Sequence, residues 1–429
     1  MQIAFHTLGC KLNFAETSTL RRVAEEAGYG IVSFDSVADI YVINTCTVTE
    51  KTDKKCRNAI RKAIRKNPLG KVIVTGCFAE LKPDEINSIN GVSLIIGNNE
   101  KAKFLHFLSS FDEKKNVNNI EDETLKNNFF HAFSIGDRTR SFLKVQDGCN
   151  YFCSYCTIPF ARGRSRNAPI AEIIKDAEYL ASKNIREIVL TGINIGDFGH
   201  STQETFFQLI QELEKVEGIS RYRLSSIEPD LLTDEIVNFV VASKKFMPHF
   251  HIPLQSGSDL ILKKMNRKYS TNHFREKIES ITKLIPHVSI GTDVIVGFPG
   301  ENEKEFNNTL VFLKSLSLSY LHVFSYSERE NTASAKYAEK VKDEIKNERS
   351  RILHDLSEEK KMNFYNMFID QKMNVLFESR TKDAKIYGFT ENYLKVEVPL
   401  QKKYFNNLVT VELVNYDNEK QCIIGKIIE

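Results

Sequence analysis

Three cysteines with C-x3-C-x2-C spacing, Cys149, Cys153 and Cys156, stand in one short run of the chain. Three thiolates from one loop can hold three irons of a cubane [4Fe–4S] cluster, and no fourth Cys or His stands nearby in the sequence to close the site. A structural zinc site normally has four ligands, usually paired as C-x2-C, and a ferredoxin run supplies a fourth cysteine. Disulfides are not expected without a secretory context. The loop therefore predicts a [4Fe–4S] cluster with one open iron.

The open iron can bind a second molecule, and the cysteine spacing resembles the signature of the radical-SAM superfamily. The resemblance implies that this molecule is S-adenosylmethionine (SAM), held through its amino and carboxylate groups, and that the three cysteines are catalytic. Tyr155, just before the third cysteine, is the aromatic residue usually found there and is expected near the SAM adenine. Another metal or a structural role for the loop is the alternative.

The N-terminal part of the chain contains short β-rich runs that alternate with stretches of helical composition. The runs cover residues 2–6, 39–43, 71–74 and 92–96, and the helical stretches cover residues 16–27 and 50–66. Such alternation predicts a parallel sheet with helices on its faces. Ligands bind at the carboxyl ends of the strands in such sheets, and Cys10, Cys46 and Cys77 each follow a strand end. We expect them to meet at one edge of the sheet, either as ligands of a second cluster or as buried structural cysteines.

Three motifs around these cysteines resemble the N-terminal domain of the methylthiotransferases. They are Thr7–Asn13 (Thr-Leu-Gly-Cys-Lys-Leu-Asn), Val42–Thr49 (Val-Ile-Asn-Thr-Cys-Thr-Val-Thr) and Val74–Cys77 (Val-Thr-Gly-Cys). The resemblance implies that Cys10, Cys46 and Cys77 bind an auxiliary [4Fe–4S] cluster. Cys56, in the second helical stretch, and Cys422, near the C-terminus, match none of the motifs and are expected to be structural.

Six further strand-like runs, separated by helical stretches, make up the middle of the chain. They cover residues 142–145, 187–190, 221–224, 249–252, 288–296 and 321–324. A closed (β/α) barrel needs eight such units, so six predict the partial (β/α)6 barrel of radical-SAM enzymes, whose open side admits a large substrate. The stretch before them, residues 109–128, is rich in Asp, Glu, Lys and Asn and reads as a linker or a disordered insertion.

Polar residues follow these strands at their carboxyl ends, where (β/α) barrels place their chemistry. The candidates for binding SAM are Asn194, Glu228, Gln255, Asp293 and Val294. Gly297–Glu301 (Gly-Phe-Pro-Gly-Glu) matches a common radical-SAM pattern. The alternatives are that the Gly-rich segments are only tight turns and that Asp293 caps a turn. His249 and His251 stand on one strand, and we expect only one of them to face the barrel interior.

Two basic runs are candidate contacts for phosphate. Arg162, Arg164 and Arg166 follow the cysteine loop, and the planar arginine fork matches phosphate oxygens. The helical stretch 54–66 carries seven Lys and Arg and no acid, on a chain whose formal net charge is only +3. This composition favours contact with an RNA backbone. A solvated surface is the alternative for both runs.

The C-terminal part predicts a small β-barrel of the oligonucleotide-binding kind, after a long charged helical stretch at 340–368. Its strand-like runs cover residues 373–378, 384–390, 393–398, 408–414 and 421–428. Residues 384–396 resemble the TRAM domain, an RNA-binding module that ends methylthiotransferases. The candidates for RNA contact are Tyr387, Phe389, Tyr393 and Lys395, with core packing as the alternative for each aromatic residue.

The resemblance covers nearly the whole chain in the domain order of the family. It predicts an α/β chain with a methylthiotransferase N-terminal domain at 1–108, a linker at 109–134, a partial radical-SAM barrel at 135–365 and a TRAM domain at 366–429. The resemblance implies that one SAM methylates a sulfur carried on the auxiliary cluster. A second SAM, cleaved reductively at the cluster of the C-x3-C-x2-C loop, yields a 5′-deoxyadenosyl radical. That radical removes hydrogen from the C–H bond that becomes methylthiolated.

Within this family the cysteine motifs look most like the MtaB type. The implied substrate is N6-threonylcarbamoyladenosine at position 37 of the tRNA anticodon stem-loop, which is converted to its 2-methylthio derivative. The isopentenyladenosine enzyme and the type that modifies an aspartate of a ribosomal protein remain alternatives. An alternative from another class is an iron–sulfur RNA-binding protein without radical chemistry. The implied partners are tRNA, a sulfur donor and an electron donor such as flavodoxin or ferredoxin.

The composition fits an intracellular enzyme. The N-terminus has no basic region followed by an apolar run, so no signal peptide is expected, and no apolar stretch approaches the length that spans a bilayer. Eight cysteines in such a chain point to metal binding rather than to disulfides. We therefore expect a protein of the reducing cytoplasm without a membrane partner.

Overall fold

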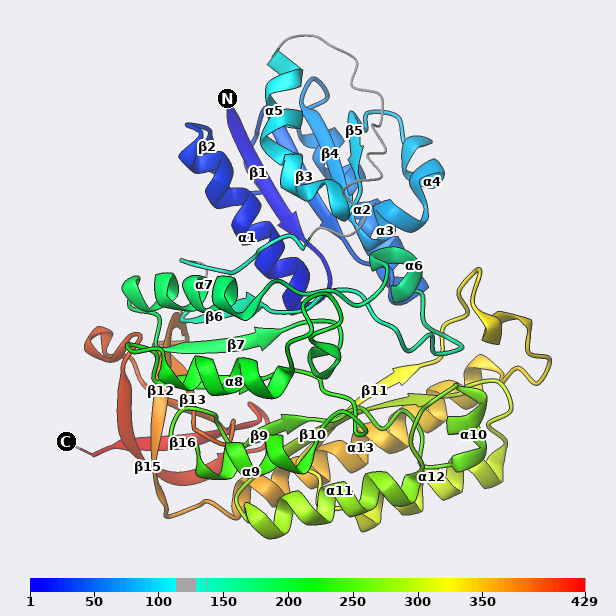
Figure 1. Cartoon of the computed structure of the whole chain (residues 1–429), viewed down its shortest axis with the longest axis vertical. Helices are drawn as coiled ribbons and strands as arrows, with labels where there is room; N and C mark the ends of the chain where they lie inside the picture. Colours follow the sequence, from blue (N-terminus) through cyan, green and yellow to red (C-terminus); the bar gives the residue numbers. More distant parts are fainter. Residues whose placement is uncertain (113–128, 137, 429) are drawn as a thin grey trace.

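The N-terminal domain is built on five parallel strands in the order β2-β1-β3-β4-β5 (Figure 1). They are β1 (Gln2–Thr7), β2 (Gly30–Val32), β3 (Ile40–Thr45), β4 (Lys71–Gly76) and β5 (Leu94–Ile96). The predicted parallel sheet is confirmed, and β2 is the strand that the sequence did not indicate. It has three residues at the sheet edge and buries none of them fully, so its hydrophobic pattern is too short to read.

Five helices cover this sheet, and two of them begin at junctions that carry cysteines. They are α1 (Lys11–Glu26), α2 (Glu50–Lys66), α3 (Cys77–Leu81), α4 (Pro83–Asn87) and α5 (Phe104–Asp112). One apolar cluster joins α2 to the sheet, and a second joins α1 and α5 to its other face. The strand order reverses between β1 and β3, and ligands bind beside such a reversal at the carboxyl ends of the strands.

The computed structural model describes residues 1–112, 129–136 and 138–428. Most of the predicted linker at 109–128 lies outside the described residues, and residues 109–112 are the end of α5. After this segment the chain contacts both neighbouring domains. Phe133 forms a bridge with Leu143 of the barrel, and the Phe133 N–H donates to Oγ1 of Thr19 in α1.

The central domain is a curved, open barrel of six strands, as predicted. Two three-stranded parallel sheets, β6-β7-β8 and β9-β10-β11, are joined by parallel bridges that connect Tyr222 with Phe246 and Ser226 with His251. The strands are β6 (Arg140–Lys144), β7 (Glu187–Thr191), β8 (Arg221–Leu224), β9 (His249–His251), β10 (Ser289–Val296) and β11 (Tyr320–Ser325). The two end strands, β6 and β11, are not paired with each other, so the barrel is open between them.

The helices of this domain lie on the outside of the barrel and bury its main apolar core (Figure 1). They are α6 (Ile158–Arg162), α7 (Ile170–Ser182), α8 (Phe206–Lys215), α9 (Asp234–Ala242), α10 (Asp259–Lys264), α11 (Thr271–Leu284), α12 (Glu303–Ser315) and α13 (Asp343–Asn366). The N-terminal domain lies over the carboxyl end of β6. This position brings the cysteines of the two domains toward the same interface.

The C-terminal domain is a closed barrel in the strand order β12-β13-β14-β16-β15, which confirms the predicted small β-barrel. Its strands are β12 (Lys372–Lys382), β13 (Lys385–Phe389), β14 (Lys395–Pro399), β15 (Leu408–Asp417) and β16 (Cys422–Ile427). The domain docks on the first strands of the central barrel. Arg221 donates to the carbonyl oxygens of Phe389 and Asn374 at 2.9 Å each, and Arg223 donates to the carbonyl oxygen of Thr390 at 2.6 Å.

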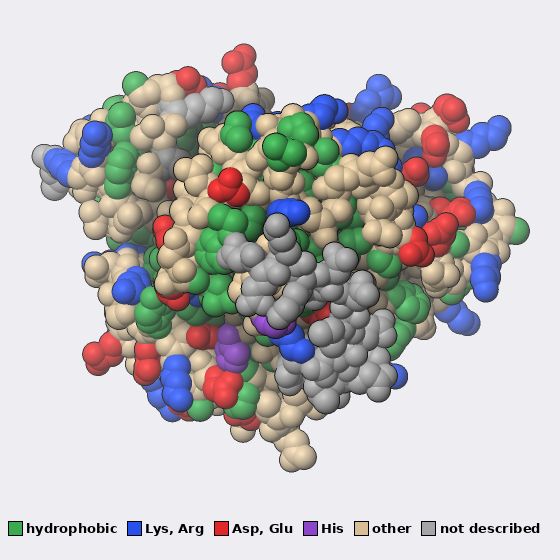
Figure 2. Space-filling model, turned by 90° about the horizontal axis from the view of Figure 1, so that it is seen from above, with side chains coloured by type: hydrophobic (Ala, Val, Ile, Leu, Met, Phe, Trp, Pro, Cys, Tyr) green, Lys and Arg blue, Asp and Glu red, His purple; other side chains and the backbone are tan. Residues whose placement is uncertain are grey.

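The face of the molecule that is seen from above in the orientation of Figure 1 carries charges of both signs. In Figure 2, Lys and Arg side chains are interspersed with Asp and Glu, and Lys and Arg gather mainly along the upper edge of the view. This distribution agrees with the small formal net charge of +3. In the described part of the chain, every helix is too short or too polar to cross a membrane.

Candidate functional site

Cys10, Cys46 and Cys77 meet at one edge of the N-terminal sheet, as predicted. Cys10 directly precedes α1, Cys46 follows β3, and Cys77 is the first residue of α3 directly after β4. Two glycines make this approach possible. Gly9 has φ +110°, and a Cβ there would lie 2.6 Å from Cβ of Cys46; Gly76 has φ +99°, and a Cβ there would lie 2.3 Å from a backbone oxygen. The glycines before Cys10 and Cys77 are therefore required by the site itself.

The three thiols can bind a metal only as thiolates, and thiolates in a buried site need a positive charge beside them. Burial, followed by the neighbouring Cys77 and Cys10, raises the pKa of the Cys46 thiol to about 12. Burial also raises the pKa of Cys77. The iron of a cluster would supply the missing charge, because thiolates are the form that binds metal. Cys56 is buried close by, but its Sγ donates to the carbonyl oxygen of Cys46 at 3.3 Å, which agrees with its expected structural role.

The C-x3-C-x2-C loop follows the carboxyl end of β6. Burial raises the pKa of Cys149 and that of Cys156 to about 12, so these thiols stay protonated unless a metal ion binds them. Nη1 of Arg267 donates to Sγ of Cys153 at 3.1 Å, and its Nη2 forms a very short ion pair with Glu228. Burial raises the pKa of Glu228 to about 7, although the Arg267 charge opposes this shift.

Two predicted SAM residues flank the loop. Asn194 is 3% exposed, and neither its side-chain oxygen nor its side-chain nitrogen has a hydrogen-bond partner in the described structure. Buried amides are normally paired, so this amide fits a bound polar molecule. Gln146 fixes its position, because Oε1 of Gln146 accepts from the N–H groups of Ile193 and Asn194 and its Nε2 donates to the carbonyl oxygen of Gly148. The ring of Tyr155 meets that of Phe298 edge-on, in a small apolar cluster.

The other predicted SAM residues lie on and beside β10. Gln255 has φ +70°, and its backbone pairs with both sides of Val294. Asp293 faces the barrel interior, where burial would raise its pKa but His251 and His322 hold it below its ordinary value. Val294 is fully buried in the outer apolar core, on the opposite face of β10. A contact of Val294 with SAM would therefore have to come from its backbone.

The expectation that only one of His249 and His251 faces the barrel interior is wrong. Residues two apart on a strand share a face, and both rings contact the ring of Tyr320. Nε2 of His249 also lies 2.9 Å from the Tyr320 hydroxyl.

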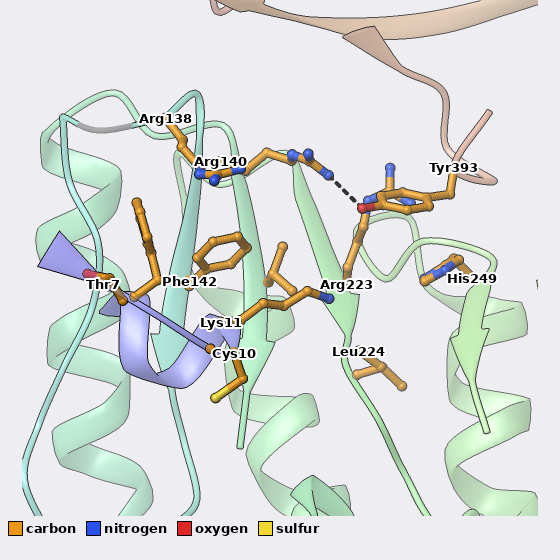
Figure 3. A pocket seen from close by; sticks show the side chains of 13 residues that line it. Thr7, Cys10, Lys11, Arg138, Arg140, Phe142, Arg223, Leu224, His249 and Tyr393 are labelled. Carbon is orange, nitrogen blue, oxygen red and sulfur yellow. Dashed lines mark hydrogen bonds between the residues drawn. The ribbon is translucent and has the colours of Figure 1, made fainter. Parts of the chain in front are cut away.

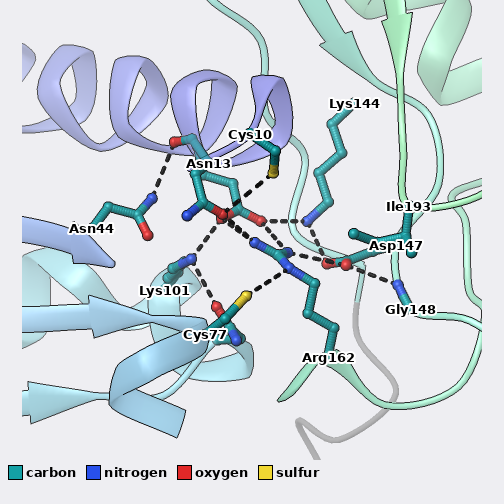
Figure 4. A network of polar contacts seen from close by, with 12 residues as sticks. Cys10, Asn13, Asn44, Cys77, Lys101, Lys144, Asp147, Gly148, Arg162 and Ile193 are labelled. Atoms are coloured by element: carbon teal, nitrogen blue, oxygen red, sulfur yellow. Dashed lines mark hydrogen bonds and ion pairs between the residues drawn. The ribbon is translucent and has the colours of Figure 1, made fainter. Parts of the chain in front are cut away.

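A buried ionic network runs from Cys77 to Asp147, two residues before Cys149 (Figure 4). Arg162 donates through Nε to Sγ of Cys77 at 3.3 Å and through Nη1 to Glu16 at 2.9 Å and to Asp147 at 3.0 Å. Lys144 contacts both carboxylates, at 3.0 and 2.7 Å, and Lys101 lies 2.5 Å from Glu16. With Arg166, which lies 3.2 Å from Asp147, the network contains four cations and two carboxylates. This excess of positive charge beside Cys77 suits an anionic cluster.

The network corrects the prediction for the arginines after the cysteine loop. Arg162 is 2% exposed and Arg166 is 7% exposed, and both are committed to buried carboxylates, so they do not form a phosphate-binding surface. Arg164 is exposed and lies over the ring of Phe152. It is the member of this run that remains a candidate for contacting phosphate.

A cavity of about 330 Å³ lies between the three domains (Figure 3). Its walls combine the start of α1, the first strands of the central barrel and one residue of the C-terminal barrel. The lining residues with polar or charged side chains are Thr7, Cys10, Lys11, Arg138, Arg140, Arg223, His249 and Tyr393. The cavity is therefore cationic, and the sulfur-bearing Cys10 lies at its edge.

The cavity also places the C-terminal aromatic residues. Tyr393 accepts from Nη1 of Arg140 at 3.2 Å, and its ring lies 4.5 Å from that of His249. Phe389 stacks on Tyr393 and lies beneath Arg140. These two rings lie at the seam between domains. Tyr387 and Lys395 lie together elsewhere on the barrel, with Nζ of Lys395 4.6 Å from the centre of the Tyr387 ring.

Several residues of the site were missed by sequence reasoning. Arg267 stands in a run with Lys263, Lys264 and Lys268, which resembles a solvated basic surface. Glu187 stands in a fully buried strand, and Glu16 stands in a buried stretch of α1. Their roles depend on partners more than a hundred residues away or in a neighbouring strand, and nothing in the local pattern indicates them.

Comparison with known proteins agrees with this geometry. The family model of the Radical SAM superfamily matches residues 143–313, and that of the Uncharacterized protein family UPF0004 matches residues 2–97. Among solved structures, the radical S-adenosylmethionine methyltransferase TsrM from Kitasatospora setae, with cobalamin and a [4Fe–4S] cluster bound, aligns with a TM-score of 0.55 at 12% identity, over 76% of this chain and 74% of that chain. The cobalamin-dependent radical enzyme OxsB aligns with a TM-score of 0.50 at 14% identity, over 82% and 56%. At these identities the likeness shows the fold.

Curated relatives match almost the whole chain. The threonylcarbamoyladenosine tRNA methylthiotransferase MtaB of Bacillus subtilis (strain 168) is 40% identical over 96% of this chain and 93% of that protein. MtaB of Aquifex aeolicus (strain VF5) is 39% identical, over 92% and 96%. A tRNA-2-methylthio-N(6)-dimethylallyladenosine synthase of Syntrophus aciditrophicus (strain SB) is 32% identical, over 92% and 85%. The chain therefore belongs to the radical-SAM methylthiotransferases, a family that uses SAM and two [4Fe–4S] clusters, and within it to the MtaB type.

Proposed function

We propose that this enzyme converts N6-threonylcarbamoyladenosine at position 37 of tRNA to its 2-methylthio derivative. The cavity between the three domains carries the proposal, because it sets Cys10 beside a cationic lining and an aromatic residue of the C-terminal barrel. An enzyme that modifies a base needs a pocket that receives the base outside its stack. The relatives named MtaB are, by name, threonylcarbamoyladenosine tRNA methylthiotransferases, which supports the same substrate.

We propose that Cys10, Cys46 and Cys77 hold the auxiliary [4Fe–4S] cluster and that Cys149, Cys153 and Cys156 hold the catalytic one. When bound, the catalytic cluster would cleave SAM reductively, and the auxiliary cluster would carry the sulfur of the methylthio group. The chain positions and shields them. Arg162 donates to Cys77 and Arg267 donates to Cys153, and hydrogen bonds to a ligating sulfur tune a cluster's reduction potential.

For SAM, we propose contacts with Tyr155, Asn194, Glu228, Gln255 and Asp293, and with the backbone of Val294. The unpartnered amide of Asn194 gives the strongest support. Glu228 follows β8 and Asp293 lies on β10, and their carboxylates can accept hydrogen bonds from a ribose hydroxyl or an amino group.

For the tRNA backbone, we propose contacts with the exposed side of α2 and with Arg164. On α2, Arg57 and Lys62 are paired with Glu85 and Asp35. The exposed cations Lys54, Lys55, Arg61 and Arg65 have no ion pair in the described structure. Tyr387 and Lys395 are the proposed contacts on the C-terminal barrel. Each phosphate contact would make binding more sensitive to salt.

We propose an electron donor such as flavodoxin or ferredoxin, because the reductive cleavage of SAM needs electrons. We also propose a separate sulfur donor, because each methylthio group takes up one sulfur atom. The cytoplasm is the proposed compartment, and all eight cysteines are free thiols. We keep the division into a cluster domain at 1–108, a linker at 109–134, a barrel at 135–365 and a TRAM domain at 366–429 as our proposed domain boundaries.

Nucleoside mass spectrometry tests the proposed reaction. The substrate would be tRNA whose adenosine 37 carries no methylthio group at C2. It would be incubated anaerobically with the reconstituted enzyme, SAM, a reductant and sulfide. A methylthio mass gain on threonylcarbamoyladenosine is the expected result. A gain on isopentenyladenosine instead would move the substrate, and formation of 5′-deoxyadenosine without any change in tRNA would overturn the tRNA assignment.

A further inference from the structure

The cationic lining of the cavity contains a lysine that has no acidic partner. Lys11 is the first residue of α1 and directly follows Cys10. Its side chain extends into the cavity toward Arg223 (Figure 3). In the described structure, Lys11 forms no hydrogen bond through its amine and has no Asp or Glu within ion-pair distance. A positive charge that faces a cavity without a counter-ion is a place for an anionic group of a ligand.

The neighbouring arginines are already neutralised. Glu187 is fully buried and forms ion pairs with Arg223 at 2.8 Å, Arg221 at 3.8 Å and Arg140 at 3.9 Å. Glu378 lies 2.9 Å from Arg140, and Glu391 lies 3.2 Å from Arg221. Three arginines therefore meet three carboxylates, and the remaining donors of Arg223 bond carbonyl oxygens of the C-terminal barrel. Arg138, at the far wall, lies 4.9 Å from the centre of the Phe14 ring.

The position of Lys11 next to Cys10 limits which anion it can bind. If Cys10 ligates the auxiliary cluster, C2 of the target adenine must lie close to this residue during methylthio transfer. In the adenine ring, C2 and C6 flank the same nitrogen, N1, and the threonylcarbamoyl group is attached to the amino nitrogen on C6. Its carboxylate is thus carried on the edge of the base that contains C2. A base with C2 near Cys10 places this carboxylate within the same part of the cavity as Lys11.

We propose that Lys11 binds the carboxylate of the threonylcarbamoyl group and thereby selects an anionic substituent over a neutral one. This inference rests on the proposed function and names the specificity-determining residue for it. A single lysine amine matches a single carboxylate in charge, and an isopentenyl group would leave the amine in the cavity unpaired. The tRNA backbone is another source of anions, so the test must separate a carboxylate on the base from a phosphate.

A cycle of two enzymes and two substrates makes this separation. The substrates are anticodon stem-loops that carry either threonylcarbamoyladenosine or its methyl ester, which removes the negative charge. The enzymes are the wild type and Lys11→Met, both as reconstituted full-length proteins. For the wild type, we expect the ester to lower kcat/KM and the affinity of the stem-loop, measured by fluorescence anisotropy, by roughly 10- to 100-fold. For Lys11→Met, the acid and the ester should differ by less than about threefold.

Control variants show whether the loss is specific. Lys11→Arg keeps the charge and should restore most of the preference for the acid. Lys215→Met removes a lysine that is paired with Glu212 on the outside of α8 and should leave the preference unchanged. Iron and sulfide contents should match the wild type in Lys11→Met, which shows that the neighbouring Cys10 still holds its cluster. Formation of 5′-deoxyadenosine shows separately that the C-x3-C-x2-C loop is intact.

The outcomes separate the two proposals. If the wild type modifies the threonylcarbamoyl substrate and Lys11→Met loses activity equally on acid and ester, Lys11 binds a phosphate or supports the fold, and this inference is overturned while the proposed function stands. If the wild type discriminates between acid and ester and Lys11→Met discriminates equally well with no loss of activity on either, another residue binds the carboxylate and this inference is also overturned. If the wild type modifies neither substrate, the proposed function itself fails.

Discussion

Nε of Arg162 lies 3.3 Å from Sγ of Cys77, so the helix that follows one cysteine loop donates a hydrogen bond to a cysteine of the other site. The same guanidinium reaches Asp147, two residues before Cys149, at 3.0 Å. The two sites are thus connected by a single side chain that is almost fully buried. Transfer of a methylthio group requires a fixed arrangement of both sites, and a rigid charged connection is suited to hold it.

Replacing Arg162 should weaken this connection strongly. Arg162→Met leaves the buried carboxylates of Glu16 and Asp147 with less compensation, and breaking such a network costs about 3 kcal/mol or more. We expect a lower free energy of unfolding in urea and a lower occupancy of the auxiliary cluster. Arg164→Met, two residues away and exposed, is the matched control. Equal stability and iron content for both variants would contradict the assigned role of the network.

The two cysteine sets should be separable by chemical analysis. Cys10→Ala, Cys46→Ala and Cys77→Ala together should remove about four irons and four sulfides, one cubane of two. This variant should still cleave SAM to 5′-deoxyadenosine, because the C-x3-C-x2-C loop is unchanged. The opposite triple variant, at Cys149, Cys153 and Cys156, should lose SAM cleavage and retain the other cubane. A full iron count in the first variant would rule out the auxiliary cluster.

Glu301 should make stability depend on pH. Burial raises the pKa of this carboxyl to about 7 from an ordinary value of 4.5, against the opposing effects of the Gly297 N–H and Arg349. Between these two pH values the folded state binds more protons than the unfolded state, so this group lowers stability as pH rises. The loss is on the order of 3 kcal/mol once pH exceeds 7.

The comparison of Glu301→Gln with the wild type isolates this effect, because glutamine can still accept hydrogen bonds at this position. The variant should gain stability relative to the wild type between pH 4.5 and about 7, measured by urea unfolding, and the difference should then stay constant. Glu303→Gln is a suitable control, since Glu303 also contacts Arg349 but is largely exposed. A difference that does not change with pH would show that Glu301 is ionised throughout.

The architecture was largely readable from the sequence because its signals are local. The alternation of strands and helices and the short strands of the C-terminal barrel each lie within a few residues of chain. The sequence predicts a cluster at the C-x3-C-x2-C loop for a chemical reason, since only a few spacings suit a cluster with an open iron. The strand β2 escaped because it is short and only partly buried.

The contacts around the cysteines were not readable, because they form between distant segments. Arg162 and Glu16 are separated by 146 positions, and only the docking of two domains brings them together. From sequence alone an arginine beside a cysteine loop is therefore a candidate phosphate ligand, and its distant partners exclude that role. Tyr393 is a similar case, because the docking of the C-terminal barrel against β8 and β9 turns an apparent RNA contact into a wall of the cavity.

Glu187 should control how the C-terminal barrel docks. Its carboxylate is fully buried among Arg140, Arg221 and Arg223, and the last two also bond carbonyl oxygens of the C-terminal barrel. Glu187→Gln keeps the size of the side chain but leaves three buried cations with two remaining carboxylates. We expect a loss of about 3 kcal/mol in the free energy of unfolding and faster proteolysis near the start of the C-terminal barrel. Glu212→Gln, an exposed residue that pairs with Lys215, should change neither measurement. If Glu187→Gln unfolds and is cleaved like the wild type, the docking depends on the apolar contacts and carbonyl hydrogen bonds rather than on this buried charge.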